Sequence, residues 1–435
     1  MKTISHIKHF IKQWWKDFWG ICCHEWKLIV HDGGVLIIFT IGALGYPLLY
    51  NLMYYNGVLE NVAVAVVDDA NCAESRRYIR EVDATRELEI AYRCATMAEA
   101  EQLFQQRKVN GIIYFPKDFG QKLARMETAT LSIYADMSSF LYYKNLMMGA
   151  NFVMLHEIGK IQIERYAAAG FTEEQSMQLV SAIPYEENNP YNRTFSYTIF
   201  FLSAALLMVV QQTMFYGMSM LAGTQREEHR SFALLPSNLE GVGINRVVLG
   251  RGFAYGLLYV AIGIYIAFIV PALFDFPQRG SFWDILVLLL FFITDCVFFC
   301  STWSSFITRR ETVFILLLVM SPVAMFLTGF SWPTTSFPFF WKCFSYLLPS
   351  TFGCQAFINL NTAGGDLSTI QPQIIAMTIQ GTLYYLTACL AVFAENRFIH
   401  SEKVQRIKAR RKAILRQLDT KVKITENVEP LEIEH

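Results

Sequence analysis

One short segment near the middle of the chain carries a dense run of charge. Residues 223–236 read Gly-Thr-Gln-Arg-Glu-Glu-His-Arg-Ser-Phe-Ala-Leu-Leu-Pro, so Arg and Glu are followed at once by apolar residues. A short amphipathic helix of this kind is typical of an element that docks into a groove of a partner. A solvated loop helix is the alternative. The residues expected to make the contact are Arg226, Glu227, Glu228, Phe232, Leu234, Leu235 and Pro236.

Three further polar residues stand inside long runs that are mostly apolar. A charged residue in a membrane helix costs about 2.5–3.5 kcal/mol on insertion scales, so Asp295 is a candidate for a functional role. It would face a pathway and meet a cation or a polar group of a substrate. The alternative is a protonated or hydrogen-bonded packing residue beside Thr294. Gln211 and Gln212 are candidates of the same kind, and they suit hydrogen bonds between helices equally well.

The familiar motifs of catalysis are absent from the sequence. It contains no Gly-x-x-x-x-Gly-Lys-Ser/Thr loop for phosphate, no Gly-x-Ser-x-Gly elbow and no His-Glu-x-x-His. No His/Cys group has the spacing of a metal site. We therefore expect no cofactor, no metal and no enzymatic activity of the chain's own; an intramembrane enzyme would need paired groups, and Asp295 stands alone. With 37 basic and 37 acidic residues, bulk charge favours no nucleic-acid partner.

Long runs without Asp, Glu, Lys or Arg predict where the chain crosses a bilayer. Of 435 residues, 53% are apolar and 17% charged, against about 25% charged in an ordinary soluble domain. A bilayer core about 30 Å thick needs roughly 20 apolar helical residues. We predict a membrane α-helical bundle of six transmembrane helices, with five helices and a re-entrant segment as the alternative. The runs are 35–55, 194–225, 252–274, 285–308 (broken only by Asp295), 312–341 and 367–394.

The distribution of Lys and Arg predicts the orientation of these spans. Basic residues concentrate in residues 1–34, after the second span, at Arg309 and Arg310, and in the tail 396–435, whereas 330–369 holds only Lys342. Cytoplasmic segments carry such an excess, so both termini are predicted to be cytoplasmic. In residues 1–34, apolar residues recur at three- and four-residue steps with lysines mostly off the stripe. This favours an amphipathic helix in the membrane interface, with a solvated helix packed on a partner as the alternative.

Residues 56–193 are polar enough to form an extracytoplasmic domain. Apolar runs at 62–67, 88–92, 111–115 and 130–135 predict strands, and 73–82, 97–107 and 118–126 predict helices. This alternation favours a small α/β sheet, followed by a long helical arm at 140–169. Two cysteine pairs, Cys72 with Cys94 and Cys343 with Cys354, lie on the predicted outer side, where either could form a disulfide.

Several ordered motifs resemble type-2 ATP-binding-cassette (ABC) exporter permeases of the long-ectodomain, multidrug-efflux-like subgroup. Arg226, Glu227, Glu228 and Leu234-Leu-Pro236 match the family's cytoplasmic signature, although Arg230-Ser231 replaces the usual Gly-Thr. The predicted extracytoplasmic domain carries motifs in the order found in the family's long-ectodomain members. These motifs are Val62–Asp68, Ser75-Arg76, Val109–Phe119 and Tyr134-Ala-Asp136. The closing pattern appears at Leu327–Pro333, Phe337-Pro338 and Leu347–Thr351. The resemblance covers about residues 35–395.

This resemblance implies a permease that pairs with a second permease chain, identical or paralogous, and with two cytoplasmic ABC ATPase subunits. The coupling helix would lie within 224–245, inside a membrane region of 194–395, and residues 337–351 would form a short broken helix. Substrate would leave a bacterial cytoplasmic (inner) membrane, with hand-over to a periplasmic adaptor and an outer-membrane channel among the expectations. Membrane lipids are also expected to contact the chain. A membrane receptor or scaffold with an external ligand-binding α/β domain is the rival interpretation.

Overall fold

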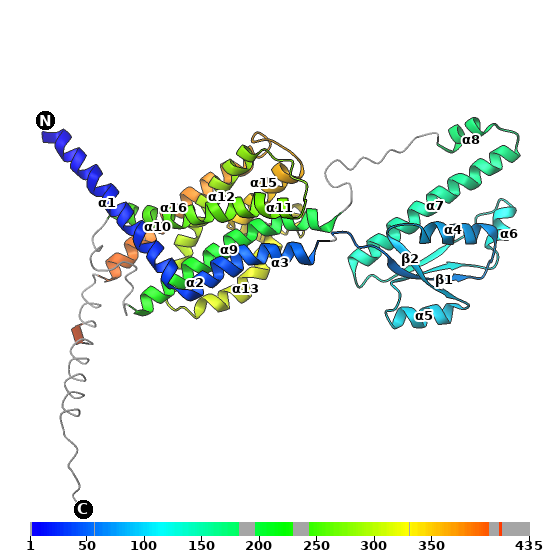
Figure 1. Cartoon of the computed structure of the whole chain (residues 1–435), viewed down its shortest axis with the longest axis horizontal. Coiled ribbons are helices and arrows are strands. Elements are labelled where there is room, and N and C mark those ends of the chain that lie inside the picture. Colours follow the sequence, from blue (N-terminus) through cyan, green and yellow to red (C-terminus); the bar gives the residue numbers. More distant parts are fainter. Residues whose placement is uncertain are drawn as a thin grey trace, which may run out of the picture. The chain divides into compact units, whose positions relative to one another are not determined.

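The computed structural model describes residues 2–55, 57–181, 196–228, 243–329, 331–399 and 409–410 (Figure 1). These residues form two compact units. One, the membrane unit, lies within 1–55 and 197–435, and the other, the α/β unit, lies within 56–196.

Within the described residues, the membrane unit contains five helices that are long and apolar enough to cross a bilayer. They cover Gly33–Met53, Ala204–Glu227, Ile244–Leu273, Phe282–Ser304 and Gln371–Glu395. Their elements are α2 (Gly33–Ile37), η1 (Ile38–Gly45), α3 (Tyr46–Met53), α9 (Tyr197–Glu228), α10 (Ile244–Ile264), η3 (Tyr265–Ile269), α11 (Val270–Leu273), α12 (Phe282–Ser304) and α16 (Gln371–Ile399). Each corresponds to a predicted apolar run, so five of the six predicted runs form long apolar helices.

The remaining run, 312–341, is divided into shorter elements. It contains α13 (Thr312–Leu327), η4 (Thr334–Ser336) and the start of α14 (Phe339–Ser345). The 16 residues of α13 give a length of about 24 Å, less than the roughly 30 Å of a hydrocarbon core. α15 (Pro349–Phe357) and η5 (Ile358–Thr362) follow. The break expected within 337–351 is therefore confirmed, since α14 ends at Ser345 and α15 begins at Pro349.

Two of the long helices contain a π-helical stretch just before a proline. η1 precedes Pro47, and η3 precedes Pro271. Proline has no N–H to donate and its ring crowds the preceding turn, so a wider turn accommodates it without ending the helix. Both spans stay continuous through their prolines.

Helix α12 forms the centre of the membrane unit and packs against α9, α10, α15 and α16. Phe292 of α12 is fully buried. A Cβ on Gly353 of α15 would lie 2.4 Å from the Phe292 ring, so only glycine lets α15 approach α12 this closely. The N-terminal helix α1 (Lys2–His31) packs on α10 through the buried residues Phe18 and Ile21. Part of its apolar stripe is thus used inside the chain.

The α/β unit is built on a four-stranded mixed sheet in the order β2-β1-β3-β4. β1 (Val62–Asp68) runs parallel to β2 (Leu88–Cys94) and β3 (Gly111–Phe115), and β4 (Ser132–Ala135) runs antiparallel to β3. The helices are α4 (Ala73–Asp83), α5 (Met97–Gln105), α6 (Phe119–Ala124), α7 (Phe140–Ala168) and α8 (Glu173–Val180). All four predicted strands and the long arm are confirmed, with small shifts at their ends.

Helices cover both faces of this sheet (Figure 1). Val62, Val64 and Val66 of β1 point into a core shared with α4 and α7. Ala65 and Val67 point the other way, into a core with α5. Because β1 is buried on both faces, it reads as a continuous apolar run rather than an alternating one.

Candidate functional site

The last turn of α9 is where the described chain reaches the predicted coupling segment. Arg226 and Glu227 lie in this turn, and Glu228 is the last residue of the helix. The other predicted contact residues lie outside the described residues; they are Phe232, Leu234, Leu235 and Pro236. The structure therefore describes the attachment point of the segment to the membrane unit.

Arg226 does not extend into solvent as a docking residue would. Its side chain is 3% exposed and forms an ion pair with Glu395 of α16, with 3.2 Å between Nη2 and Oε1. It also donates to the carbonyl oxygens of Ser304, at 2.8 Å, and Ile307. The Ser304 carbonyl is at the end of α12, where helical C=O groups have no partner within the helix, and Ile307 lies in the turn that follows. Arg226 thus joins α9, α12 and α16.

A second buried ion pair lies beside the first. Arg251 of α10 and Glu25 of α1 approach to 2.8 Å between Nε and Oε1, and the Glu25 side chain is fully buried. Tyr255 donates to the other Glu25 oxygen at 3.4 Å. Arg251 also interacts electrostatically with Arg226 and Glu395. We call these four residues, Glu25, Arg226, Arg251 and Glu395, the charge cluster.

The charge cluster has balanced charge and takes one residue from each of four helices. Burial removes water from all four charged side chains, and this cost offsets most of the attraction between them. The net stabilisation by the complete cluster is therefore small. Removing one partner is costly, because an uncompensated charge remains buried. The cluster therefore makes the relative positions of α1, α9, α10 and α16 depend on one another.

Next to this cluster, Arg310 connects the α12–α13 turn to α9 and to the junction of α1 and α2. Its guanidinium makes two parallel contacts with the Asp32 carboxylate, at 2.8 and 2.9 Å, and Nη1 donates to the Thr224 hydroxyl at 3.1 Å. Its backbone N–H donates to Glu227 at 3.2 Å. Asp32 meanwhile caps α2 by accepting from the N–H groups of Gly34 and Val35.

Two glycines permit these contacts. A Cβ on Gly223 would lie 2.8 Å from the Arg310 nitrogen and 2.9 Å from the Arg309 carbonyl carbon, both backbone atoms. A Cβ on Gly34 would lie 2.3 Å from Nη2 of Arg310. Together, Asp32, Arg310, Thr224 and Glu227 form what we call the Arg310 clamp.

Of the predicted pathway residues, Gln211 has a partner in the broken helix. Its Oε1 accepts from the backbone N–H of Ser350, at 2.6 Å, in the first turn of α15. Gln380 and Tyr384 of α16 donate to the carbonyls of Tyr346 and Leu347 at 3.1 and 2.6 Å. Side chains thus satisfy backbone groups that the break leaves free, as apolar surroundings require. Gln212, next along α9, is mostly buried too.

Asp295 lies apart from Gln211 and Gln212, in the wall of a cavity between α10, α12 and α16. This cavity has a volume of about 470 Å³, and neither glutamine lines it. The Asp295 side chain is buried, and neither carboxylate oxygen has a hydrogen-bond partner among the described residues. The three predicted pathway residues therefore do not converge on one site.

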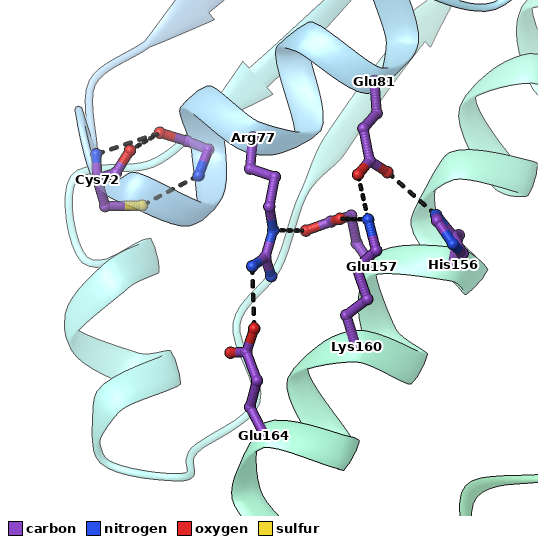
Figure 2. Close-up of polar contacts among 8 residues, drawn as sticks. Cys72, Arg77, Glu81, His156, Glu157, Lys160 and Glu164 are labelled. Atoms are coloured by element: carbon purple, nitrogen blue, oxygen red, sulfur yellow. Dashed lines mark hydrogen bonds and ion pairs between the residues drawn. The ribbon is translucent and has the colours of Figure 1, made fainter. Parts of the chain in front are cut away.

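In the α/β unit, charged side chains join α4 to α7 (Figure 2). Arg77 of α4 donates to Glu157 at 2.5 Å and to Glu164 at 3.1 Å. Glu81 of α4 pairs with Lys160 and lies 3.2 Å from Nδ1 of His156. We call this set of six residues the α4–α7 network.

The α4–α7 network also brings possible metal ligands together. Oxygen or nitrogen atoms of Glu81, His156 and Glu157 lie within 4.8 Å of one another. Partial burial raises the pKa of Glu81, but hydrogen bonds from Lys160 and His156 outweigh it and lower that pKa to about 2. Since Lys160 and Arg77 already neutralise both carboxylates, the arrangement favours an ion-pair network that fixes α4 to α7.

All nine cysteines are free thiols in the structure. Cys72 begins α4 as its N-cap, where its sulfur accepts from the Ser75 N–H at 3.3 Å. Cys354 donates to the Ala204 carbonyl at 3.2 Å. Neither disulfide left open by the sequence, Cys72–Cys94 or Cys343–Cys354, is present.

Sequence reasoning missed the residues that pair with Arg226 and its neighbours. Arg251 and Glu395 had a detectable signal, because each is a charge at the end of a long apolar stretch, whereas Glu25 lies ten residues before the nearest one. In the sequence, Arg310 indicates only the orientation of the membrane spans, and Asp32 carries no signal of a role. Their pairing across more than 200 positions in the sequence is visible only in the folded chain.

Comparison with protein families agrees with this architecture. The family model described as ABC-2 family transporter protein matches residues 34–390 of the 435. No curated protein matches the chain. The matched region runs from the start of the first long apolar helix almost to the end of the last, and it includes the α/β unit, α9 and the charge-bearing turn before α13. The chain is therefore a multi-pass membrane protein that belongs to the ABC-2 family of transporter membrane components.

Proposed function

We propose that this chain is the permease subunit of an exporter in a bacterial cytoplasmic membrane. ATP would be hydrolysed by a separate cytoplasmic ABC subunit, since permeases of this family typically lack an ATPase domain and generally pair with ABC ATPases. A second permease chain, identical or paralogous, completes the transporter. Both termini are cytoplasmic, and the α/β unit is outside, in reach of periplasmic partners.

Six spans are part of this proposal. α13 is short, but the apolar run that contains it continues to residue 341. With α13 as a span, the number of crossings is even, and the basic segments all lie on one side. If α13 enters and leaves on the same side, the count falls to five and the tail lies outside. Labelling of a cysteine placed in the basic tail distinguishes the two arrangements.

The observation that carries the proposal is the fixing of the last turn of α9 by ion pairs and hydrogen bonds. The buried Arg226 of the charge cluster and the exposed Glu227 of the Arg310 clamp form the start of the predicted coupling segment. A displacement of that segment by an ATPase would move α9, and the two sets of contacts would pass the displacement to α1, α10, α12 and α16. Energy enters from the partner, because the sequence has no phosphate-binding loop of its own.

Affinity purification tests the partnership. A tagged full chain, extracted with its native neighbours, is expected to copurify with an ABC ATPase and to raise its ATP turnover in nanodiscs. Glu228→Arg reverses a charge in the coupling segment and is expected to abolish the stimulation, whereas Glu174→Arg, at the start of α8, serves as a matched control. A chain that folds but never retains an ATPase would favour the receptor or scaffold interpretation.

Thiol labelling in intact cells and inverted vesicles tests the orientation. A membrane-impermeant reagent is expected to modify Cys72 from outside and a cysteine at position 234 from the cytoplasmic side. Labelling of both from the same side would contradict the proposal, because the coupling segment could not then reach a cytoplasmic ATPase.

A further inference from the structure

The cavity beside Asp295 has walls of mixed chemistry. Leu249 of α10, Leu290 and Phe298 of α12, and Met377 of α16 give it an apolar surface. Gly381 of α16 faces the carboxyl group, since a Cβ at that position would lie 3.5 Å from Asp295 Oδ1. Asp295 is among the residues that line the cavity, and Gly381 places no side chain beside its carboxyl group.

The carboxyl group has no donor to satisfy it. The hydroxyls of Thr294, Thr378 and Thr382 line the cavity, but each donates to a carbonyl of its own helix at 2.7 Å. No Lys, Arg or His is among the described residues that line it. A buried carboxylate without donors is strongly unfavourable, so the group needs either a proton or an external cation.

A second cavity of about 500 Å³ adjoins the first. The two share Leu249, Leu290, Thr294 and Phe298, and the second extends to Phe18 of α1 and to Phe253 and Gly256 of α10. Apart from Thr294 its lining is apolar or glycine. A Cβ on Gly256 would meet no atom within 4 Å, so this part of the cavity is open.

We propose that the adjoining cavities bind a lipophilic organic cation, with its charged group against Asp295 and its apolar body in the second cavity. The volumes lie in the range of small-molecule pockets, about 300–1,000 Å³. An anionic lipid headgroup would be repelled by the carboxylate. The site is defined by the structure alone, but its role as a loading site for transport rests on the proposed export function.

Binding is expected to exchange a proton for the cation. In the empty cavity the Asp295 carboxyl group keeps its proton; on binding, the O–H bond breaks, the proton leaves to solvent and the carboxylate pairs with the cation. The other ionisable groups nearby are Cys296 and Cys300 on α12 and Tyr384 and Tyr385 on α16. α10 contributes Leu249, which does not ionise.

Equilibrium binding of radiolabelled tetraphenylphosphonium tests the acidic group, with the full chain in nanodiscs of neutral phosphatidylcholine. Saturable binding is expected. Asp295→Asn keeps the size of the side chain and is expected to weaken affinity about tenfold or more, because the ion pair is lost. Asp295→Glu should retain binding within about threefold. Asp284→Asn is the matched control on the same helix and should bind like the wild type.

Calorimetry in buffers of different ionisation enthalpy tests the exchange. The wild type should release about one proton per cation bound at neutral pH, and Asp295→Asn should release none. Equal binding by Asp295→Asn and the wild type would overturn the proposal. So would equal weakening by Asp295→Asn and Asp284→Asn, since the effect would then not depend on the cavity.

The second cavity is tested with alkyltrimethylammonium competitors. The wild type should prefer a dodecyl chain to a butyl chain, because the longer chain reaches the second cavity. Gly256→Leu fills that space and should reduce this preference about tenfold, while Gly33→Leu, at another position with open space around its Cβ, should leave it unchanged. An unchanged preference in Gly256→Leu would contradict the placement of the apolar body.

These measurements need no ATPase, so the two proposals fail separately. If tetraphenylphosphonium binds through Asp295 but no ATPase copurifies, the export function fails and the site stands. If an ATPase copurifies but tetraphenylphosphonium binding does not depend on Asp295, only the proposed cation site is wrong.

Discussion

Two sets of ion pairs join helices in this chain, and they lie in opposite surroundings. The α4–α7 network lies at a water-facing helix pair, where Lys160 remains 37% exposed. The charge cluster lies inside the membrane unit, where the Arg226 side chain is 3% exposed. Solvent and salt therefore screen the charges of the α4–α7 network strongly and those of the charge cluster only weakly.

The difference shows what each set is suited to do. In the α4–α7 network, Glu157 contacts both Arg77 and Lys160, so loss of one contact leaves others and water nearby. In the charge cluster, a displaced residue leaves its partner buried and unpaired, which makes the four helices move together or not at all. An element that transmits movement needs the second property, whereas a rigid α/β unit needs only the first.

The largest effect is expected from Arg226→Ala. It leaves Glu395 buried without its ion-pair partner and removes the side-chain donor to the carbonyls of Ser304 and Ile307, so the free energy of unfolding should fall by about 3–5 kcal/mol. A thiol-reactive dye that reports exposure of the buried Cys296 and Cys300 on heating measures this. Arg226→Met combined with Glu395→Met removes both charges and should recover most of the stability without restoring ATPase stimulation. If the double variant were as unstable as Arg226→Ala, the buried unpaired charge would not be the cause.

A smaller effect is expected at the Arg310 clamp. Gly223→Ala introduces a Cβ against the backbone of Arg309 and Arg310 and must displace the turn before α13. Overpacking of this kind costs about 1–3 kcal/mol, and stimulation of the ATPase should fall with it. Gly33→Ala adds a Cβ in open space and should change stability by less than about 0.5 kcal/mol. If both variants stimulated the ATPase equally, the Arg310 clamp could not be the element that transmits movement from the coupling segment.

Acid should loosen the α4–α7 network. The pKa of Glu81 is lowered to about 2 in the folded chain, against about 4.3 when unfolded. Its stabilising contribution is complete above pH 4.3 and is lost as the pH falls towards 2. Modification of the buried Cys94 by 2,2′-dipyridyl disulfide, which reacts in acid, should therefore accelerate over that interval. Glu81→Gln should remove that part of the pH dependence; an unchanged profile would exclude Glu81 as its source.

The smallest effect is expected for the exposed pair of Arg86 and Glu60, whose side chains are 59% and 41% exposed. Arg86→Gln should change the stability of the α/β unit by less than about 0.5 kcal/mol, because solvent and salt screen such pairs. The rate at which 2,2′-dipyridyl disulfide modifies the buried Cys94 at neutral pH measures this change in stability. A loss comparable to that of Arg226→Ala would show that burial does not separate the two kinds of ion pair.

The sequence predicted the elements of the fold because their signals are local. Five of the six apolar runs and the strand from Gly111 to Phe115 depend on neighbouring residues, and the structure places them as expected. The site was harder to predict. Arg226 was recognised, but as a docking residue, because its local charge pattern carries no information on Glu395 or on the end of α12. Gln211 was assigned to a pathway for the same reason, since its partner Ser350 is 139 residues away.

The hydrogen bond between Gln211 and Ser350 has a mechanical consequence. α9 holds α15 through Gln211 and reaches the charge cluster through Arg226, 15 residues further on, or about 22 Å along one unbroken helix. An unbroken helix that shifts along its axis at one end also shifts at the other end. A displacement of α9 at its C-terminal end would therefore also displace the start of α15.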